Sequence, residues 1–432
     1  MIKNNYYISI VVTTRNDNHG ENMSKKNQFF LDMWSKQVKK YNIACELIIV
    51  EWNPDPNKPL LKDKLNFPTL NKNQIVRIIT VPNSDHKKFE NSKKLKIYQM
   101  IAKNVGIKRS NGKFILVTNI DIIFSNDFYK FLSKKNLQEG TIYRCDRYDV
   151  DYNKFNVYGF NEIQILKNCT VINKKLYSIN TKTKEKSYVQ ISIFSIIYFA
   201  LKSFKKNIPL KNKKYFFLYP FYKMFSFYKM FSFYKMFSIK NIKHFSNYKK
   251  FTFKKLLRII IYFYIYEFYK FIINIFITIN RTIYKRVYRT IKYYFGQLIV
   301  AVFKKKIHTN ACGDFTLTCK KTWFDLNGYY EYQGYSWHID SIFLFKALYN
   351  KKRFINLKYK IYHINQNDKT SGYIVGEKHL FNKLSKDKVK YINDKKLNKI
   401  KEELKKNPKF LKNSKWGMNN KILNEKKYLY KK

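Results

Sequence analysis

Two polar side chains, Asn119 and Asp121, stand two positions apart directly after a short apolar run, residues 114–118 with the sequence FILVT. A run without polar alternation predicts a strand that is buried on both faces. Parallel sheets present ligand-binding groups at the carboxyl ends of their strands, and these two side chains would point the same way. One or two carboxylates plus phosphate oxygens can hold a divalent cation that bridges two phosphates. An Asx turn at a strand end explains the pair equally well.

A second group of ionisable side chains lies beyond residue 307, in a stretch with several Gly and Trp residues. It consists of Asp314, Glu331, His338 and Asp340. A carboxylate in such a group could accept the proton of a substrate hydroxyl. Asp340 has an alternative interpretation as a first-turn helix acid that the helix dipole stabilises, with Ser336 as the N-cap.

Alternating strands and helices must position these residues. The sequence predicts strands over residues 7–14, 46–51, 75–81, 114–118 and 141–147, and helices from 24 to 41 and from about 91 to 105. A strand, helix, strand order implies right-handed crossovers and a parallel sheet. Asn91 or Ser92 is the expected cap of the second helix, and Gly106 near its end permits close backbone packing.

Several motifs resemble one enzyme family. Residues 104–121, NVGIKRSNGKFILVTNID, are similar to the core of inverting, family-2-like glycosyltransferases of the GT-A fold, in which a D-x-D motif holds the metal and diphosphate of a nucleotide-sugar. VVTTRND at 11–17 and LIIVEWNP at 47–54 resemble the nucleotide-contacting strand ends of a related subgroup. GDF, WFDLNGYYE and HIDS, between 313 and 341, resemble the acceptor-side segment. The resemblance covers residues about 6–169 and 308–372, with a further W-G at Trp416.

On the donor side, the resemblance implies that Asp121 binds Mg²⁺ or Mn²⁺. Asn119 stands where the family has its first acid, so it would contact a ribose or sugar hydroxyl instead. A late His completes the metal shell in many GT-A enzymes, which makes His363 a second metal ligand by the same resemblance. An isolated histidine is otherwise more often structural.

The resemblance also implies donor-binding roles for four residues outside the metal site. Thr13 and Arg15 would lie near the base and the diphosphate, Glu51 would hold the base or ribose, and Asn104 would approach the sugar nucleotide. The alternatives are a solvated loop charge for Arg15, a simple strand end for Glu51 and ordinary helix capping for Asn104.

On the acceptor side, the resemblance assigns the role of catalytic base to Asp340, with Glu331 as the reserve candidate. In an inverting transfer the acceptor hydroxyl attacks the anomeric carbon in line with the departing diphosphate. A carboxylate must therefore take the hydroxyl proton on the face opposite the metal.

The middle of the chain, residues 171–306, has a different composition. It holds about thirty Lys and Arg against Glu185 and Glu267, and FYKMFS occurs three times in residues 221–238. Residues 256–279 are long enough to span a membrane, but each central charge would cost about 2.5 to 3.5 kcal/mol. Two interpretations remain open: helices lying in the headgroup layer of an anionic membrane, or an aromatic-rich helical insertion packed on the catalytic domain.

Size, charge and cysteines set further limits. The chain of 432 residues can hold two or three domains, and its formal net charge of +57 lies about half in the middle segment. Five cysteines without a C-x-x-C pair suggest neither a disulfide framework nor a zinc site, which fits a reducing cytosol. A strand pattern that begins by Tyr7 leaves no room for a signal peptide, so we expect a cytoplasmic catalytic part.

The sequence therefore predicts an α/β protein of the GT-A fold, Rossmann-like with a mostly parallel central sheet and a large helical, basic and aromatic insertion. The expected parts are a nucleotide-sugar-binding half at 1–170, the insertion at 171–306, a catalytic half at 307–375 and a Lys-rich helical tail at 376–432.

The expected function is metal-assisted, inverting transfer of the hexosyltransferase type from a nucleotide-diphosphate sugar to a glycan, lipid or protein hydroxyl. The competing hypothesis is a non-catalytic, membrane-peripheral or nucleic-acid-binding protein on a degenerate transferase scaffold. Since the chain resembles none of the RNA-recognition, zinc-finger or helix-turn-helix modules, no specific nucleic acid is expected.

Overall fold

The computed structural model describes residues 6–18, 22–151, 161–175, 177–188, 307–365, 377–411 and 413–430. These residues belong to one compact unit, which is formed by residues 1–190 and 307–432. A second unit is formed by residues 191–306, so the FYKMFS repeats and the 256–279 stretch lie outside the described residues.

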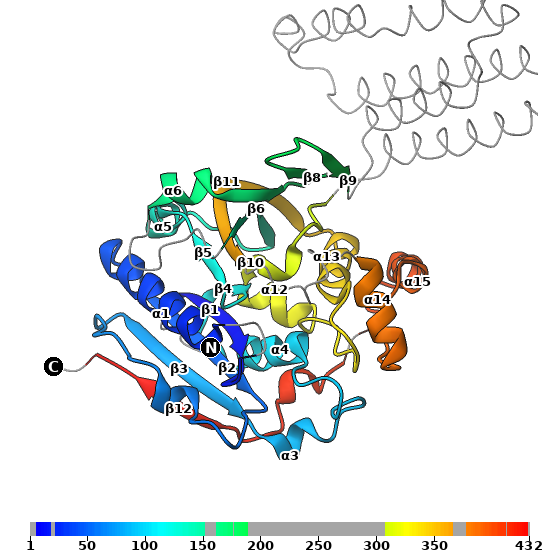
Figure 1. Cartoon of the computed structure of the whole chain (residues 1–432), viewed down its shortest axis with the longest axis horizontal. Coiled ribbons are helices and arrows are strands. Elements are labelled where there is room, and N and C mark those ends of the chain that lie inside the picture. The colour runs from blue at the N-terminus through cyan, green and yellow to red at the C-terminus, as the bar shows by residue number, and fades with distance from the viewer. Residues whose placement is uncertain are drawn as a thin grey trace, which may run out of the picture. The chain divides into compact units, whose positions relative to one another are not determined.

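Within the described residues, twelve strands form a single sheet. Its parallel part runs in the order β3 (Gln74–Val81), β2 (Cys45–Trp52), β1 (Tyr6–Thr14) and β4 (Gly112–Thr118) (Figure 1). The apolar runs predict these strands because their side chains are buried on both faces of the sheet. The architecture is thus mixed α/β with a large sheet whose central strands, β3 to β4, are parallel, compatible with the expected Rossmann-like class.

The rest of the sheet combines segments from both sides of residues 189–306. Strand β10 (Phe315–Cys319) lies antiparallel between β4 and β6 (Thr141–Asp151). Strand β11 (Arg353–Asn365) is parallel to β6 and antiparallel to β5 (Ile122–Phe124). The two halves that the sequence predicts therefore share one sheet.

Two regions differ from the expected organisation. The sequence places residues 171–188 in the insertion, yet β7 (Cys169–Asn173), β8 (Tyr177–Asn180) and β9 (Lys186–Tyr188) extend the main sheet. The tail is not helical throughout, because β12 (Asn424–Tyr428) pairs antiparallel with β3. The lysines of β12 gave this strand a charged, loop-like sequence pattern.

Helices cover both faces of the sheet. The remaining bounds are α1 Met23–Lys40, α2 Leu61–Lys64, α3 Asn83–His86, α4 Gln99–Arg109, α5 Asn126–Ser133, α6 Glu162–Lys167, α12 Lys320–Asp325, α13 Ile339–Tyr349, α14 Glu377–Lys386 and α15 Asp394–Lys406, with 3-10 turns at Cys312–Asp314 and Trp416–Met418. One apolar cluster joins α1 to the sheet, and a second joins α4, α12 and α13 to its other face. The central strands are thereby shielded from water on both sides.

Helix α4 begins later than the sequence suggests. Asn91 and Ser92 do not cap it; Tyr98 occupies the N-cap position without a side-chain hydrogen bond, and Asn91 has the left-handed φ of 63° in a preceding turn. The helix also ends later than expected, at Arg109. The close packing expected at Gly106 is confirmed: a Cβ there would lie 2.4 Å from Cγ1 of Val11, so only glycine lets α4 pack this closely on β1.

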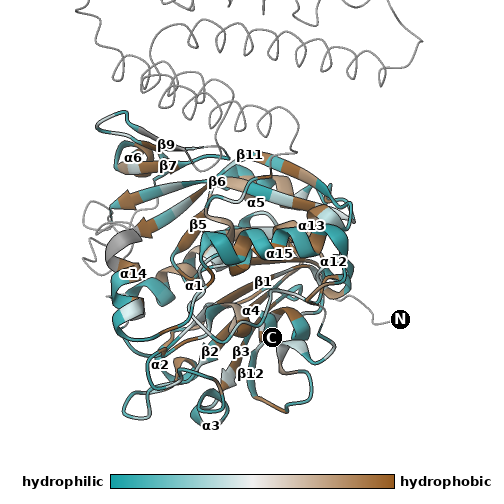
Figure 2. Cartoon of the chain, turned by 90° about the vertical axis from the view of Figure 1, so that its right-hand side faces the viewer, coloured by the Kyte–Doolittle hydropathy of each residue, from teal (hydrophilic) through white to brown (hydrophobic). Residues whose placement is uncertain are grey.

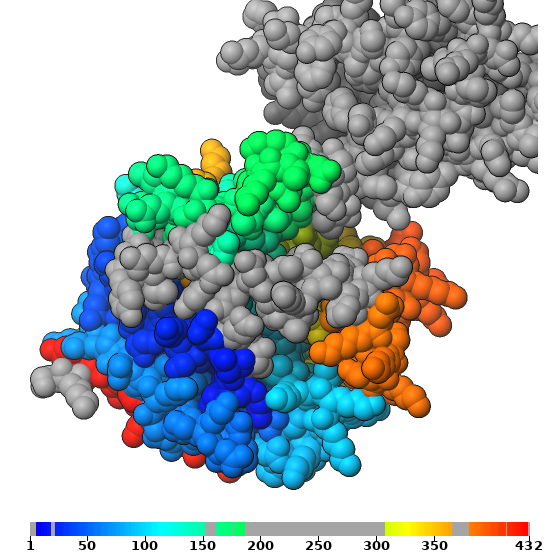
Figure 3. Space-filling view, viewed as in Figure 1, coloured from blue at the N-terminus to red at the C-terminus, as the bar shows by residue number. Residues whose placement is uncertain are grey.

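The outer helices are amphipathic. Leu397, Ile400 and Leu404 of α15 are buried, whereas the same helix presents lysines outward. Figure 2 shows the hydrophobic colour concentrated along the strands, and in Figure 3 α14 and α15 lie at the surface in orange. In the part of the chain described above, no helix is both long and apolar enough to cross a bilayer.

Candidate functional site

The ends of β1 and β2 are joined by hydrogen bonds. Oγ1 of Thr13 donates to the carbonyl of Val50 at 3.2 Å. The buried guanidinium of Arg15 pairs with Asp17 and donates to the carbonyl of Asn53. Arg15 is therefore not a solvated loop charge; it orders the two loops that end the first two strands.

Glu51, at the end of β2, is fully buried. Its Oε1 accepts the N–H of Leu61 at 2.9 Å and its Oε2 accepts the hydroxyl of Thr80 at 3.3 Å. Burial raises the pKa of this carboxyl above its ordinary value, against the lowering effect of these two hydrogen bonds. In this structure the side chain anchors the loop that follows β2.

Asn119 lies at the centre of a polar cluster, because the register of β10 on β4 places Asp314 beside it. Its Nδ2 donates to Oδ1 of Asp314 at 2.5 Å. Its Oδ1 accepts from Nε2 of Gln99 at 3.0 Å and from Nζ of Lys103 at 2.6 Å. Three contacts thus fix the orientation of the amide, and among the described residues one Nδ2 hydrogen is left for another partner.

Strand β11 brings His363 to Asp121. Nε2 of His363 lies 3.3 Å from Oδ2 of Asp121, and Nδ1 lies 3.0 Å from Oδ1 of Asp149 on β6. Burial alone would lower the pKa of His363, but the two carboxylates raise it, to about 10. Burial would also raise the pKa of Asp121, but the charge of His363 holds it well below its usual range.

One oxygen of Asp121 remains available. Among the described residues, Oδ1 is buried and has no hydrogen-bond partner on another residue. Asp121 and His363 would form a carboxylate and imidazole donor set that suits Mn²⁺ or, less well, Mg²⁺, provided that the cation displaces the proton on Nε2 of His363. No group of three or more His, Cys, Asp or Glu side chains with metal-binding geometry occurs in the described ranges. The pair fits a cation only if substrate phosphates and water complete its shell.

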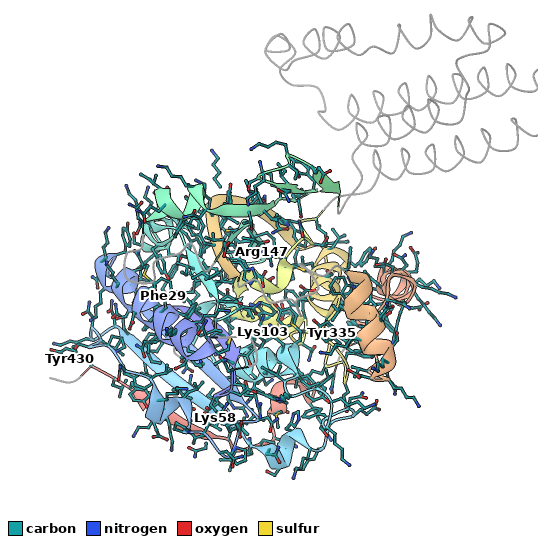
Figure 4. The ribbon with its side chains drawn as sticks, viewed as in Figure 1. Phe29, Lys58, Lys103, Arg147, Tyr335 and Tyr430 are labelled. Carbon is teal, nitrogen blue, oxygen red and sulfur yellow. The ribbon has the colours of Figure 1, made fainter. Side chains whose placement is uncertain are left out.

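Arg147 of β6 links the two sides of this cluster. It pairs with Oδ1 of Asp149 at 2.8 Å and with Asp314. Its charge therefore offsets those of two buried acids, one from each side of residues 189–306. Figure 4 shows that Arg147 and Lys103 both lie inside the unit.

Asp340 lies in the first turn of α13. The N-cap position belongs to His338, in the left-handed region with φ 63°, and not to Ser336. Oδ1 of Asp340 accepts the N–H of Ser341 at 2.7 Å, and Oδ2 lies 3.0 Å from where a Cβ on Gly313 would stand. A glycine at 313 therefore leaves room for the Asp340 carboxylate.

Lys103 of α4, to which the sequence alone assigned no role, is completely buried beside these groups. Its Nζ donates to Oδ1 of Asn119 at 2.6 Å and to the carbonyl of Gly313 at 2.8 Å. Burial lowers its pKa to about 8, although the charges of Asp314, Asp340 and Asp121 act in the opposite direction. The signal that could have identified it is a lysine within an otherwise buried stretch of helix next to the N-x-G motif.

Asn104 and Glu331 form a different set of contacts. Nδ2 of Asn104 donates to Oε1 of Glu331 at 3.0 Å and to the carbonyl of Tyr329 at 2.9 Å, and the same Oε1 accepts the N–H of Gly417 at 2.7 Å. Burial raises the pKa of Glu331, against these hydrogen bonds. The structure thus brings Asn119, Asp121, His363 and Asp340 toward Lys103, whereas Asn104 and Glu331 tie α4 to the Trp416 turn.

Comparisons with known proteins add little to this geometry. No family model matches the chain, and no curated protein matches it. Among solved structures, the crystal structure of S. aureus TarS 1-349 is similar at 16% sequence identity and a TM-score of 0.21. The match covers 33% of this chain and 36% of the TarS chain. At that TM-score the likeness carries no argument about fold or function.

Proposed function

We propose that the chain is a metal-assisted glycosyltransferase of the GT-A type, which moves a sugar from a nucleotide-diphosphate donor to an acceptor hydroxyl with inversion. The observation that supports this most is geometric. Nζ of the buried Lys103 donates to Asn119, two positions before Asp121, and to the carbonyl of Gly313, which lies against the carboxylate of Asp340. The resemblance of residues 104–121 and 313–341 to that family supports the same conclusion.

On the donor side, Asp121 and His363 would hold Mn²⁺ or Mg²⁺ together with the donor diphosphate. When bound, such a cation offsets the charge of the leaving diphosphate. The remaining Nδ2 hydrogen of Asn119 would be donated to a ribose or sugar hydroxyl. Thr13 and Arg15 would border the base and the diphosphate at the ends of β1 and β2.

On the acceptor side, Asp340 would accept the proton of the attacking hydroxyl. The acceptor oxygen forms a bond to the anomeric carbon while the bond from that carbon to the diphosphate oxygen breaks, and its electron pair leaves with the diphosphate. Attack opposite the leaving group inverts the anomeric centre. Glu331 is less suited to this role because Asn104 and Gly417 already occupy its Oε1.

The test uses the purified full chain, a panel of nucleotide-sugars and Mn²⁺, with donor hydrolysis as the readout. Asp121→Asn should reduce the rate at least 100-fold, and Asp340→Asn should reduce it about 10²- to 10⁴-fold without weakening donor binding. Asp127→Asn, at an exposed position on α5, is the control and should match the wild type.

Equal rates in all four proteins would rule out the enzyme. The non-catalytic alternative would then be measured directly, by binding of the full chain to anionic vesicles and to oligonucleotides.

A further inference from the structure

Lys103 is an unusual lysine because it is buried and both of its hydrogen-bond partners within the described residues are neutral. Its Nζ contacts an amide oxygen, that of Asn119, and a backbone carbonyl, that of Gly313. Lysines are almost never fully buried unless they are paired with an acid. A simple packing role would be filled better by an apolar side chain, so the charge itself calls for an explanation.

The two partners of Lys103 come from the two halves of the candidate site. Asn119 follows β4 and stands two positions before Asp121, on the donor side. Gly313 lies in the turn before β10 and against the carboxylate of Asp340, on the acceptor side. One ammonium group therefore joins the segment that carries the metal-binding acid to the segment beside the proposed base.

Three acids act electrostatically on the ammonium group, namely Asp314, Asp340 and Asp121. Asp314 is bonded to Arg147, and Asp121 is bonded to His363. Asp340 accepts a backbone N–H from Ser341 and interacts electrostatically with Lys103. Because like charges repel strongly in a buried environment, a cation among them lowers the free energy of holding all three carboxylates together.

We propose that Lys103 is a positioning residue: it sets the separation between the Asp121 segment and Asp340, and it offsets the mutual repulsion of Asp121, Asp314 and Asp340. This inference rests on the proposed function. It needs Lys103 to be charged, and a pKa of about 8 leaves most of the population protonated at pH 7.

The experiment compares Lys103→Met, Lys103→Arg and the control Lys130→Met, an exposed lysine on α5, in the full chain. Donor hydrolysis with Mn²⁺ gives kcat and KM, and calorimetry gives the donor Kd. Lys103→Met should lower kcat at least 100-fold with a donor Kd within about threefold of the wild type. The kcat of Lys103→Arg should be at least tenfold higher than that of Lys103→Met, and the kcat of Lys130→Met should match that of the wild type.

A pH profile separates positioning by charge from mere packing. The titratable groups that act electrostatically on Lys103 are Asp314 and Cys312 in the 3-10 turn, Asp340 on α13 and Asp121 after β4. The kcat of the wild type should fall as the pH rises through about 8, where Lys103 loses its proton. Arginine stays charged, so Lys103→Arg should lack this fall.

Wild-type kcat in a folded Lys103→Met, or equal kcat values for the Met and Arg variants, would overturn the inference. If Lys103→Met does not fold, Lys103→Gln is used in its place, and its kcat should be at least tenfold lower than that of Lys103→Arg. Loss of activity in Asp121→Asn and Asp340→Asn with full activity in Lys103→Met removes this inference alone. Full activity in all of these variants removes the proposed function itself.

Discussion

Nδ2 of Asn119 lies 2.5 Å from Oδ1 of Asp314, and the two residues come from opposite sides of residues 189–306. The amide oxygen accepts from Gln99 and Lys103, so the amide nitrogen faces the carboxylate. The resembled D-x-D motif would place a second carboxylate at 119. Asparagine is the better partner here because Asp314 already supplies the acid at this position in space.

Asn119→Asp should therefore destabilise the fold although it restores the family motif. Asp314 loses a hydrogen-bond donor and gains a like charge, and a new ion pair with Lys103 offsets part of this cost. We expect a net cost of about 1 kcal/mol at pH 7. Denaturant unfolding measures this, and the deficit should shrink at pH 5 because the two carboxyls can share one proton. Asn66→Asp, at an exposed position, is the control. An unchanged unfolding midpoint for Asn119→Asp would contradict the contact.

Lys103 should also make stability depend on pH. Its pKa is lowered from 10.5 to about 8 by burial, so between these values the unfolded chain binds more protons than the folded chain. Stability then rises with pH across that window, whereas below pH 8 the cost of the buried charge is fully present. Between pH 7.5 and 10.5, the free energy of unfolding of the wild type should rise by about 3 kcal/mol relative to that of Lys103→Met. Parallel stability curves for the two proteins would show that Lys103 is not buried as a charge.

Glu331 offers a way to distinguish a structural tie from a reserve base. Removing its carboxylate in Glu331→Ala leaves the N–H of Gly417 without its acceptor, while the amide of Asn104 keeps only the carbonyl of Tyr329. The free energy of unfolding should fall by about 1 to 3 kcal/mol, while kcat stays within about twofold. Glu331→Gln keeps an acceptor oxygen and should lose less stability. A loss of kcat as large as that in Asp340→Asn would assign the base role to Glu331 instead.

Much of the fold follows from the sequence because its strands are long apolar runs. Strands β1 to β4 and helix α1 lie within one or two residues of the predicted bounds, since buried parallel strands have no alternating pattern to misread. Local sequence patterns gave wrong predictions where tertiary contacts determine the secondary structure. Asn91 and Ser92 form a turn instead of a helix cap, and the lysine-rich β12 is a strand because β3 offers it an edge.

The candidate site was only partly predictable. Motifs suggest Asp121, Asp340 and His363 as candidates, but their partners depend on which strands pair, and a single sequence does not reveal that. The bonds of Asn119 to Asp314 follow from the register of β10 on β4, and the bond of His363 to Asp149 follows from that of β11 on β6. Lys103 belongs to no motif that assigns it a role, and only its two hydrogen-bond acceptors in the structure identify it as part of the site.

Strand β10 has a consequence for biosynthesis. The edge of β4 that it covers is apolar and is synthesised early. Phe315, which pairs with Thr118, follows it by roughly 200 residues. A ribosome that translates 5–20 residues per second needs about 10 to 40 s to add them. Throughout that interval each nascent chain exposes an unpaired strand edge that could template aggregation. Chaperone occupancy during translation is the protection that such an order of synthesis calls for.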